Sequence, residues 1–143
     1  MQVGLLDHVN VRTAKLDAMV AWYDRVLGMP SGPRPNFPFP GAWLYSAGRP
    51  TVHLIGLAAE PNVTETKLEH FAFQAIGLKE FLARLKCEKV EYELIHVPDA
   101  HVVQANVYDP DGNHIHIDFH EKEAESLQGE RIDVFSGLPG QKM

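Results

Sequence analysis

The stretch DHVNV at residues 7–11 has a counterpart in EHFAF at residues 69–73, at an offset of 62 residues. In both stretches apolar residues alternate with other residues, which is the pattern of a half-buried β-strand. A second match, at an offset of 63 residues, relates AWLY at 42–45 to ANVY at 105–108 and also relates His53 to His116. The chain therefore contains two copies of one unit, each with a histidine on its first and on its last predicted strand.

The four repeated histidines are candidate metal ligands. Imidazole nitrogen binds first-row divalent metals, and neighbouring strands lie about 4.8 Å apart, so side chains from four strands can converge on one ion. A single histidine on a strand is more often a hydrogen-bonded structural residue. Repetition at equivalent positions is what favours the metal interpretation, if the two copies pack by pseudo-symmetry. The candidates are His8, His53, His70 and His116.

The composition limits the class of protein. With 143 residues, 45% of them hydrophobic, the chain fits one domain (1–143) with an ordinary core. The net charge of -6 and the absence of a Lys/Arg run exclude the electrostatic pattern of a nucleic-acid or anionic-lipid binder. No stretch approaches the roughly 20 apolar residues of a membrane span, and the N-terminus does not resemble a signal peptide. Together with a single cysteine, these features predict a cytoplasmic protein whose ligand is a small molecule.

The first copy, at about residues 5–58, is predicted to fold as β-α-β-β-β. Apolar residues recur at helical spacing up to Leu27, where Gly28 and Pro30 supply a stop signal. Five prolines within 30–40 predict a stiff loop or a broken edge strand. The predicted strands of this copy lie at 6–12, 42–47 and 51–57, with a tight turn at 48–50.

The second copy, at about residues 68–120, repeats the order. The sequence DPDGN at 109–113 is a strong turn signal between its last two strands. The tail at 121–143 shows no clear periodicity, and we expect it to wrap a neighbouring chain or to fray. The predicted elements are strands at 69–74, 90–97, 102–108 and 114–119 and a helix at 78–85.

These segments resemble the vicinal oxygen chelate superfamily, the group of glyoxalase I, extradiol dioxygenases, methylmalonyl-CoA epimerase and the fosfomycin- and bleomycin-resistance proteins. The resemblance runs from about residue 5 to residue 120. It rests on LDHV at 6–9, WYDRVLG at 22–28, WLY at 43–45, VHL at 52–54, EHFAF at 69–73, YDPDGN at 108–113 and IHI at 115–117.

The resemblance implies an α+β fold in which two β-α-β-β-β modules pair into a cup-shaped, partly closed mixed sheet with helices outside. It also implies one divalent ion inside the cup and a homodimer, often with the cup shared between two chains. The family's metal positions fall on His8, His53, His70 and His116. The last is a departure, because the family usually has glutamate there, and the change replaces an anionic oxygen ligand with a neutral nitrogen.

Further candidates lie on and near the last strand. His114, His116, Asp118 and His120 share one face by the two-residue period of a strand. Asp118 is predicted to orient a metal ligand or to act as a base. A solvated rim position is the favoured interpretation for His114 and His120, and the alternative is that they tune a metal ligand or contact the substrate. His101 is a candidate acid–base group in a loop.

Aromatic residues of the first copy are candidate substrate contacts. Trp43 and Tyr45 alternate along one strand and are predicted to share a face with His53, so they would form an aromatic wall beside the metal. Phe37 is a candidate lid residue. The alternative is that these rings are ordinary core or dimer contacts.

The leading functional interpretation is an enzyme whose Zn, Ni, Fe or Mn ion chelates two neighbouring oxygens of a small substrate. Lyase or isomerase chemistry of the glyoxalase I type and ring-cleaving dioxygenase chemistry both remain open. The alternative is a small-molecule binding or sequestration protein of the bleomycin-resistance type without turnover, and a metal-binding protein without turnover is a third possibility.

Overall fold

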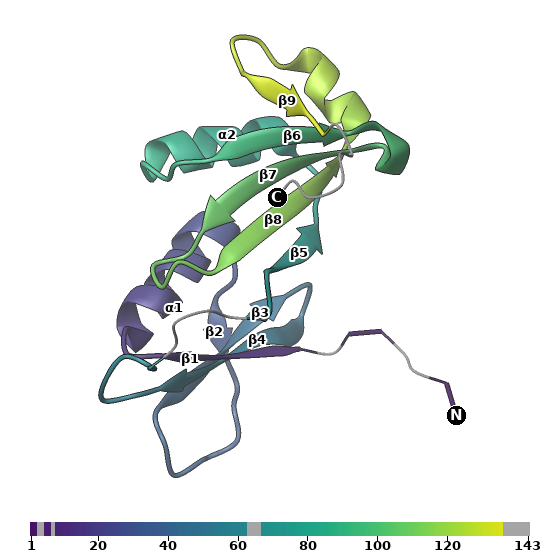
Figure 1. Cartoon of the computed structure of the whole chain (residues 1–143). Helices are drawn as coiled ribbons and strands as arrows, with labels where there is room; N and C mark the ends of the chain where they lie inside the picture. The colour runs from purple at the N-terminus through teal and green to yellow at the C-terminus, as the bar shows by residue number, and fades with distance from the viewer. Residues whose placement is uncertain (3–4, 7, 63–66, 136–143) are drawn as a thin grey trace. The chain divides into compact units, whose positions relative to one another are not determined.

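The computed structural model describes residues 1–2, 5–6, 8–62 and 67–135, and the chain divides into two compact units (Figure 1). Unit 1 comprises residues 1–67 and 109–112, and unit 2 comprises residues 68–108 and 113–143. Each unit contains one copy of the repeat, and the architecture is mixed α+β with two open mixed sheets. That the two copies form a single domain stays a prediction.

Within its described residues, unit 1 is a four-stranded sheet with one helix, and its strands lie in the order β1-β4-β3-β2. β1 runs parallel to β4, and the other neighbours are antiparallel. This arrangement confirms the β-α-β-β-β prediction, with β2 as the broken edge strand expected of the proline-rich stretch. The elements are β1 (Val9–Thr13), α1 (Leu16–Leu27), β2 (Ser31–Gly32), β3 (Gly41–Ser46) and β4 (Arg49–Gly56).

Helix α1 buries one face because its apolar residues recur at helical spacing. Met19, Tyr23 and Val26 are at most 1% exposed. The helix ends where predicted, since Gly28 adopts the left-handed conformation at φ 65° and its N–H bonds to the carbonyl of Asp24. Tyr23 also donates its hydroxyl to Asp109 at 2.9 Å, and burial raises the pKa of this phenol.

The turn between β3 and β4 begins one residue earlier than predicted, at Ala47 and not at Gly48. Ala47 and Gly48 have φ of 49° and 75°, as in a two-residue hairpin turn. Arg49 and Pro50 already belong to β4, where they pair with Ser46 and Tyr45. The sequence was misread because Pro50 suggested a turn, whereas a register irregularity between Leu44 and Tyr45 accommodates it within the strand.

Unit 2 repeats this topology. Its strand order is β5-β8-β7-β6-β9, the order of unit 1 with β9 (Ile132–Val134) added beside β6, and β5 runs parallel to β8. The apolar face of the sheet packs on the helix, with the rings of Phe81 and Phe119 5.8 Å apart. Within the described ranges, no helix is long and apolar enough to cross a bilayer. The elements are β5 (His70–Gln74), α2 (Leu78–Cys87), β6 (Glu93–Val97), η1 (Pro98–Ala100), β7 (Val102–Tyr108) and β8 (His114–His120).

The expectation that the tail frays was wrong for residues 121–135, while a contact with a neighbouring chain stays a prediction. A short 3-10 helix, η2 (Glu121–Ser126), leads to strand β9 (Ile132–Val134), which pairs in parallel with β6. Glu123 holds this segment in place, because its carboxylate accepts the backbone N–H groups of Gly77 and Leu78 at 2.8 Å each. A three-residue strand is too short to show periodicity, so the sequence gave no sign of it. Residues 136–143 lie outside the described residues.

Candidate metal centre

The repeated histidines occupy equivalent places in the two units. In each unit the first strand runs parallel to the last. His70 begins β5, whereas His8 lies immediately before β1 and not within it as predicted. Each of the two lies two residues before the residue opposite the last-strand histidine. This diagonal arrangement brings each pair into contact. The ring centroids lie 4.0 Å apart for His8 and His53, and 4.3 Å apart for His70 and His116.

In unit 1 aromatic rings surround the pair. His53 is 8% exposed, and its ring is stacked between His8 and Trp43, with the Trp43 ring 4.1 Å away and tilted by 9°. Nε2 of His53 lies 3.0 Å from the carbonyl of Pro50, to which it donates. A neutral imidazole that donates through Nε2 keeps its lone pair on Nδ1, so this hydrogen bond selects Nδ1 for any metal.

Tyr45 lies apart from this stack. Its ring packs over Gly32 of β2, where a Cβ atom would come within 2.7 Å of the ring, and its hydroxyl donates to the carbonyl of Pro33 at 2.6 Å. The irregularity after Leu44 turns Tyr45 towards the edge of the sheet. Of the two rings proposed as a wall, Trp43 therefore contacts His53, while Tyr45 supports β2.

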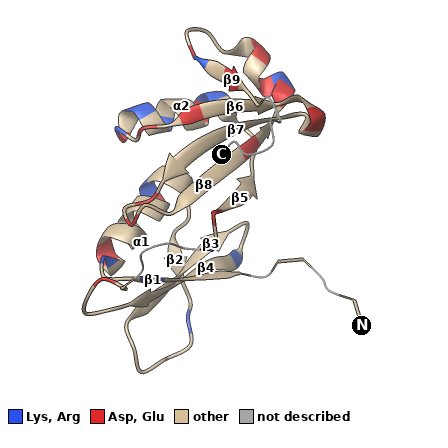
Figure 2. Cartoon of the chain, in the orientation of Figure 1, with Lys and Arg blue, Asp and Glu red and all other residues tan. Residues whose placement is uncertain are grey.

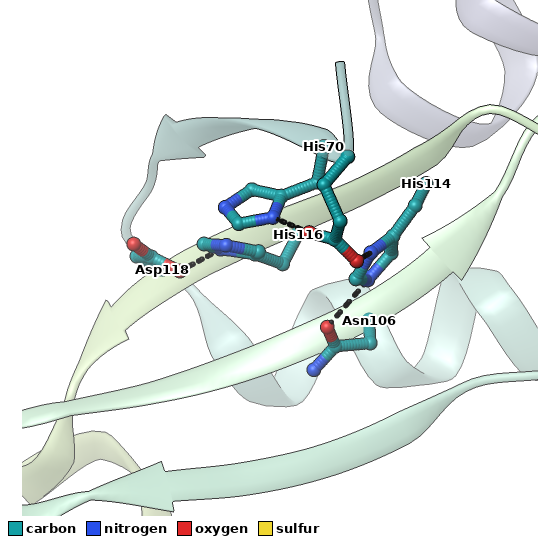
Figure 3. Close-up of polar contacts among 6 residues, drawn as sticks. His70, Asn106, His114, His116 and Asp118 are labelled. Carbon is teal, nitrogen blue, oxygen red and sulfur yellow. Dashed lines mark hydrogen bonds and ion pairs between the residues drawn. The ribbon is translucent and has the colours of Figure 1, made fainter. Parts of the chain in front are cut away.

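In unit 2 a carboxylate orients the last-strand histidine (Figure 3). Nδ1 of His116 lies 2.6 Å from Oδ1 of Asp118, which accepts its proton. Nε2 of His116 is buried and has no hydrogen-bond partner among the described residues. A buried nitrogen with an unused lone pair is unfavourable, and the carboxylate–histidine arrangement is the one that commonly orients metal-binding imidazoles. His116 therefore fits a metal ligand that binds through Nε2.

Further polar side chains stand beside His70 and His116. His114 is 9% exposed, and its Nε2 lies 2.8 Å from Oδ1 of Asn106, while its Nδ1 lies 3.2 Å from Oε1 of Glu69. Glu69 also contacts Nδ1 of His70. Ligand atoms of Glu69, His70 and His114 all lie within 4.8 Å of one another, close enough for one ion. The favoured interpretation of a solvated rim position is therefore wrong for His114, while His120 is exposed as expected.

Glu69 gives this group of side chains an anionic oxygen. The hydrogen bond with His70, assisted by the one with His114, lowers the pKa of the Glu69 carboxyl below its ordinary value. An ionised carboxylate beside two imidazoles favours a bound cation.

Glu69 and Asn106 were missed in the sequence. Strand alternation places Glu69 on the face opposite His70, but β5 begins at His70, so alternation does not constrain Glu69. A signal was present, because an acidic residue precedes the first-strand histidine in both copies, as Asp7 and as Glu69. Asp7 lies outside the described residues. Asn106 aligns with Trp43 at the same offset of 63 residues and occupies the same strand position.

The two proposed acid–base residues line one cavity of unit 2. A pocket of about 380 Å³ is bordered by Gln74, His101, Asp118 and His120. The His101 side chain is 71% exposed, and its Nδ1 lies 2.8 Å from Glu121, which also contacts His96 at 2.7 Å. These two hydrogen bonds lower the pKa of Glu121. Asp118 thus contacts His116 and also borders the pocket. The acid–base roles of Asp118 and His101 stay predictions.

Comparison with solved structures shows the same fold. A protein described as of the glyoxalase family from Bacillus anthracis superposes with a TM-score of 0.70 at 25% identity, covering 84% of this chain and 98% of that one. A glyoxalase/bleomycin resistance protein/dioxygenase domain from Frankia sp. EAN1pec gives 0.69 at 16% identity, over 83% and 99%. A lactoylglutathione lyase from Agrobacterium tumefaciens gives 0.61 at 15% identity, over 83% and 96%.

Comparison with curated protein sequences finds no match. A family model, in contrast, matches residues 5–117, which run from before β1 into β8. With the repeated β-α-β-β-β topology, this match shows that the chain belongs to the Glyoxalase/Bleomycin resistance protein/Dioxygenase superfamily.

Proposed function

We propose that the protein is a metal-dependent enzyme of the glyoxalase/dioxygenase type that acts on a small substrate with two neighbouring oxygens. The observation that supports a metal most directly is the hydrogen bonding of the two ring nitrogens of His116. Its Nδ1 is held by Asp118 at 2.6 Å, and its Nε2 is buried without a hydrogen-bond partner among the described residues. A hydrogen-bonded structural histidine would use both nitrogens, whereas a metal ligand uses one and leaves the other to a carboxylate.

His70 and His116 would hold the ion, with Glu69 as an oxygen ligand. Nδ1 of His114 would join them only in place of its contact with Glu69, because Asn106 holds its Nε2. Glu69 supplies an anionic oxygen although the usual glutamate position is His116. Two imidazoles and a carboxylate suit Fe or Mn as well as Zn or Ni. A divalent ion in this place supplies Lewis acidity towards two oxygens of the substrate.

The protein's own residues would prepare the site for that chemistry. Asp118 fixes the orientation of His116, and Asn106 fixes that of His114 through the 2.8 Å contact. Asp118 and His101, which border the same pocket, are the candidates for moving a proton to or from the substrate. Participation of His8 and His53 in the same ion, within one chain or across a homodimer, stays a prediction from the repeat.

Elemental analysis of protein purified without a histidine tag tests the metal. After incubation with Zn, Ni, Mn or anaerobic Fe, we expect about one ion per site for at least one metal, because such a donor set retains these ions. The variant His101→Ala is the control and should keep its metal. Retention of less than about 0.2 ion per chain with all four metals would contradict the proposal.

Activity screens then separate the reaction classes. Oxygen uptake with catechols would identify ring-cleaving dioxygenase chemistry, whereas isomerisation of thiohemiacetals would identify the glyoxalase I type. A protein that binds metal and is inactive in both screens would fit a small-molecule binding protein of the bleomycin-resistance type instead.

A further inference from the structure

Unit 1 presents a continuous row of rings that ends at the histidine pair. Phe39 and Phe37 are stacked with centroids 5.1 Å apart and planes 8° apart. Phe37 lies 6.4 Å from Trp43, and Trp43 is stacked on His53 at 4.1 Å. His53 in turn is stacked on His8 at 4.0 Å. The stacked rings turn their faces towards one another and their edges outward, and a flat aromatic ligand can lie across such edges, because edge-to-face contacts are a preferred arrangement of aromatic rings.

A positively charged side chain stands at the other end of this row. The guanidinium carbon of Arg34 lies 5.0 Å from the ring centroid of Phe37 and 5.1 Å from that of Phe39. One of its nitrogens donates to the carbonyl of Phe39 at 3.0 Å. It also lies over Gly41, where a Cβ atom would come within 3.0 Å of the same nitrogen, so the absent side chain leaves room for it.

Arg34 keeps donors for a ligand. A guanidinium has five N–H donors, and among the described residues only the Phe39 carbonyl accepts one from it. Within the same residues Arg34 forms no ion pair with an acidic side chain, and it is only partly exposed. A guanidinium that lies on aromatic rings and is held at one nitrogen is well placed to bind a carboxylate through two parallel hydrogen bonds.

The local charge favours an anion. Residues 25–59 contain three arginines and no aspartate or glutamate, although the whole chain has 19 acidic and 13 basic residues. Figure 2 shows β2, β3, β4 and the loop before β3 in tan and blue, while red segments lie on other elements. This part of unit 1 therefore has a positive local charge within an acidic protein, which attracts small anions.

The loop that presents these groups is held in one conformation. Prolines restrict its backbone, the Phe37 N–H donates to the carbonyl of Pro35 at 2.8 Å, and the Gly56 N–H donates to that of Pro40 at 2.9 Å. Phe37 and Phe39 nevertheless remain 39% exposed each. Rings kept exposed on a stiff loop lose little conformational entropy when a ligand binds.

We propose that this surface binds a planar organic anion, of the class of aromatic carboxylates. Arg34 holds the carboxylate, and Phe37 and Trp43 contact the flat body of the ligand. This assignment rests on the proposed function in one respect: the row of rings directs the far end of the ligand towards His53 and His8, where vicinal oxygens would be needed. Arg34 would select for the charge of the ligand, and the rings would select for its flat shape.

Isothermal titration calorimetry on the metal-free full chain tests this proposal with three probes. 2-Naphthoate is planar and anionic, 2-naphthalenemethanol is planar and neutral, and cyclohexanecarboxylate is anionic and not planar. We expect 2-naphthoate to bind at least about 10-fold more tightly than either of the others, because only it uses both Arg34 and the rings. Arg34→Gln should remove that preference over the neutral probe, while Arg49→Gln, an arginine of the same unit, should leave it unchanged.

Equal binding of the charged and neutral naphthalene probes, or an unchanged affinity in Arg34→Gln, would overturn the proposal. Sedimentation of Phe37→Leu gives a second readout, since a change in oligomeric mass with unchanged naphthoate affinity would assign the rings to a contact between copies instead. The metal-free protein keeps the two proposals distinguishable. A chain that binds naphthoate but retains no metal contradicts only the proposed function, and a chain that retains metal but does not distinguish the probes contradicts only this inference.

Discussion

The two histidine pairs occupy the same strand positions, but different surroundings hold them. In unit 1 the His53 ring is stacked between His8 and Trp43, and its Nε2 donates to the backbone carbonyl of Pro50. In unit 2 the pair lies against carboxylates, with Asp118 at His116 and Glu69 at His70. One fold can therefore repeat a pair of histidines while changing the side chains around it.

One substitution between the copies accounts for much of the contrast. Trp43 and Asn106 are equivalent by the repeat, and each lies opposite the last-strand histidine of its unit, His53 or His116. The indole covers its histidine with an apolar face, whereas the amide hydrogen-bonds to the neighbouring His114. Among the described residues, the side chains around the histidine pair are therefore more polar in unit 2 and more aromatic in unit 1. If the proposed metal binds, we expect its affinity to depend mainly on unit 2.

The largest expected effect is from His116→Ala. This change removes the nitrogen that Asp118 orients, so the metal affinity should fall by more than about 100-fold, beyond the usual effect of losing an outer partner. Titration with a chelating competitor measures it, and His120→Ala, an exposed histidine of the same strand, is the matched control. An unchanged affinity would show that the unit 2 pair does not hold the ion.

Asp118→Asn should have the next largest effect. The amide is nearly isosteric but cannot accept the imidazole proton as a carboxylate does, so we expect about a 10- to 100-fold loss of metal affinity. The same competition titration measures this loss, and Asp133→Asn on β9 serves as the control. Equal affinities of Asp118→Asn and the unchanged protein would reduce Asp118 to a packing role.

His53→Ala sharpens the comparison from the other side. If unit 2 determines the affinity, this variant should lose less than about 10-fold in metal binding, below the range expected for Asp118→Asn. The fluorescence of Trp43 should change as well, because its stacking partner is gone. A loss as large as that of His116→Ala would make the two pairs equal contributors.

The smallest expected effect concerns Glu121, another carboxylate of unit 2 that holds histidines. Its pKa is lowered in the folded state, mainly by the hydrogen bonds with His96 and His101. A group with a lowered folded pKa stabilises the fold above its unfolded pKa, and this stability is lost as the pH falls through the folded pKa. Urea unfolding at pH 6 and pH 3 should therefore show a smaller acid-induced loss for Glu121→Gln than for the unchanged chain. Identical losses would contradict the assignment.

The repeat predicted the topology and the pairing of the histidines, because His8 and His70 are at equivalent positions of the two copies, as are His53 and His116. The two-residue period of a strand placed Asp118 on the face of His116. Periodicity does not describe residues outside regular elements, and for that reason Glu69, immediately before β5, escaped prediction. The position of His114 was misjudged because burial depends on the neighbouring strands, where Asn106 and Tyr108 cover its ring.

The short strand β9 has a consequence for the free edge of the unit 2 sheet. In unit 1 the outer strand β2 has only two residues and is bordered by prolines, which makes it a poor template for a further strand. β6 has no such protection, and β9 covers it through pairs that include Leu94 with Ile132. A chain shortened to end at residue 126 would leave backbone donors and acceptors of β6 open to a second molecule, and aggregation would follow from losing three residues of pairing.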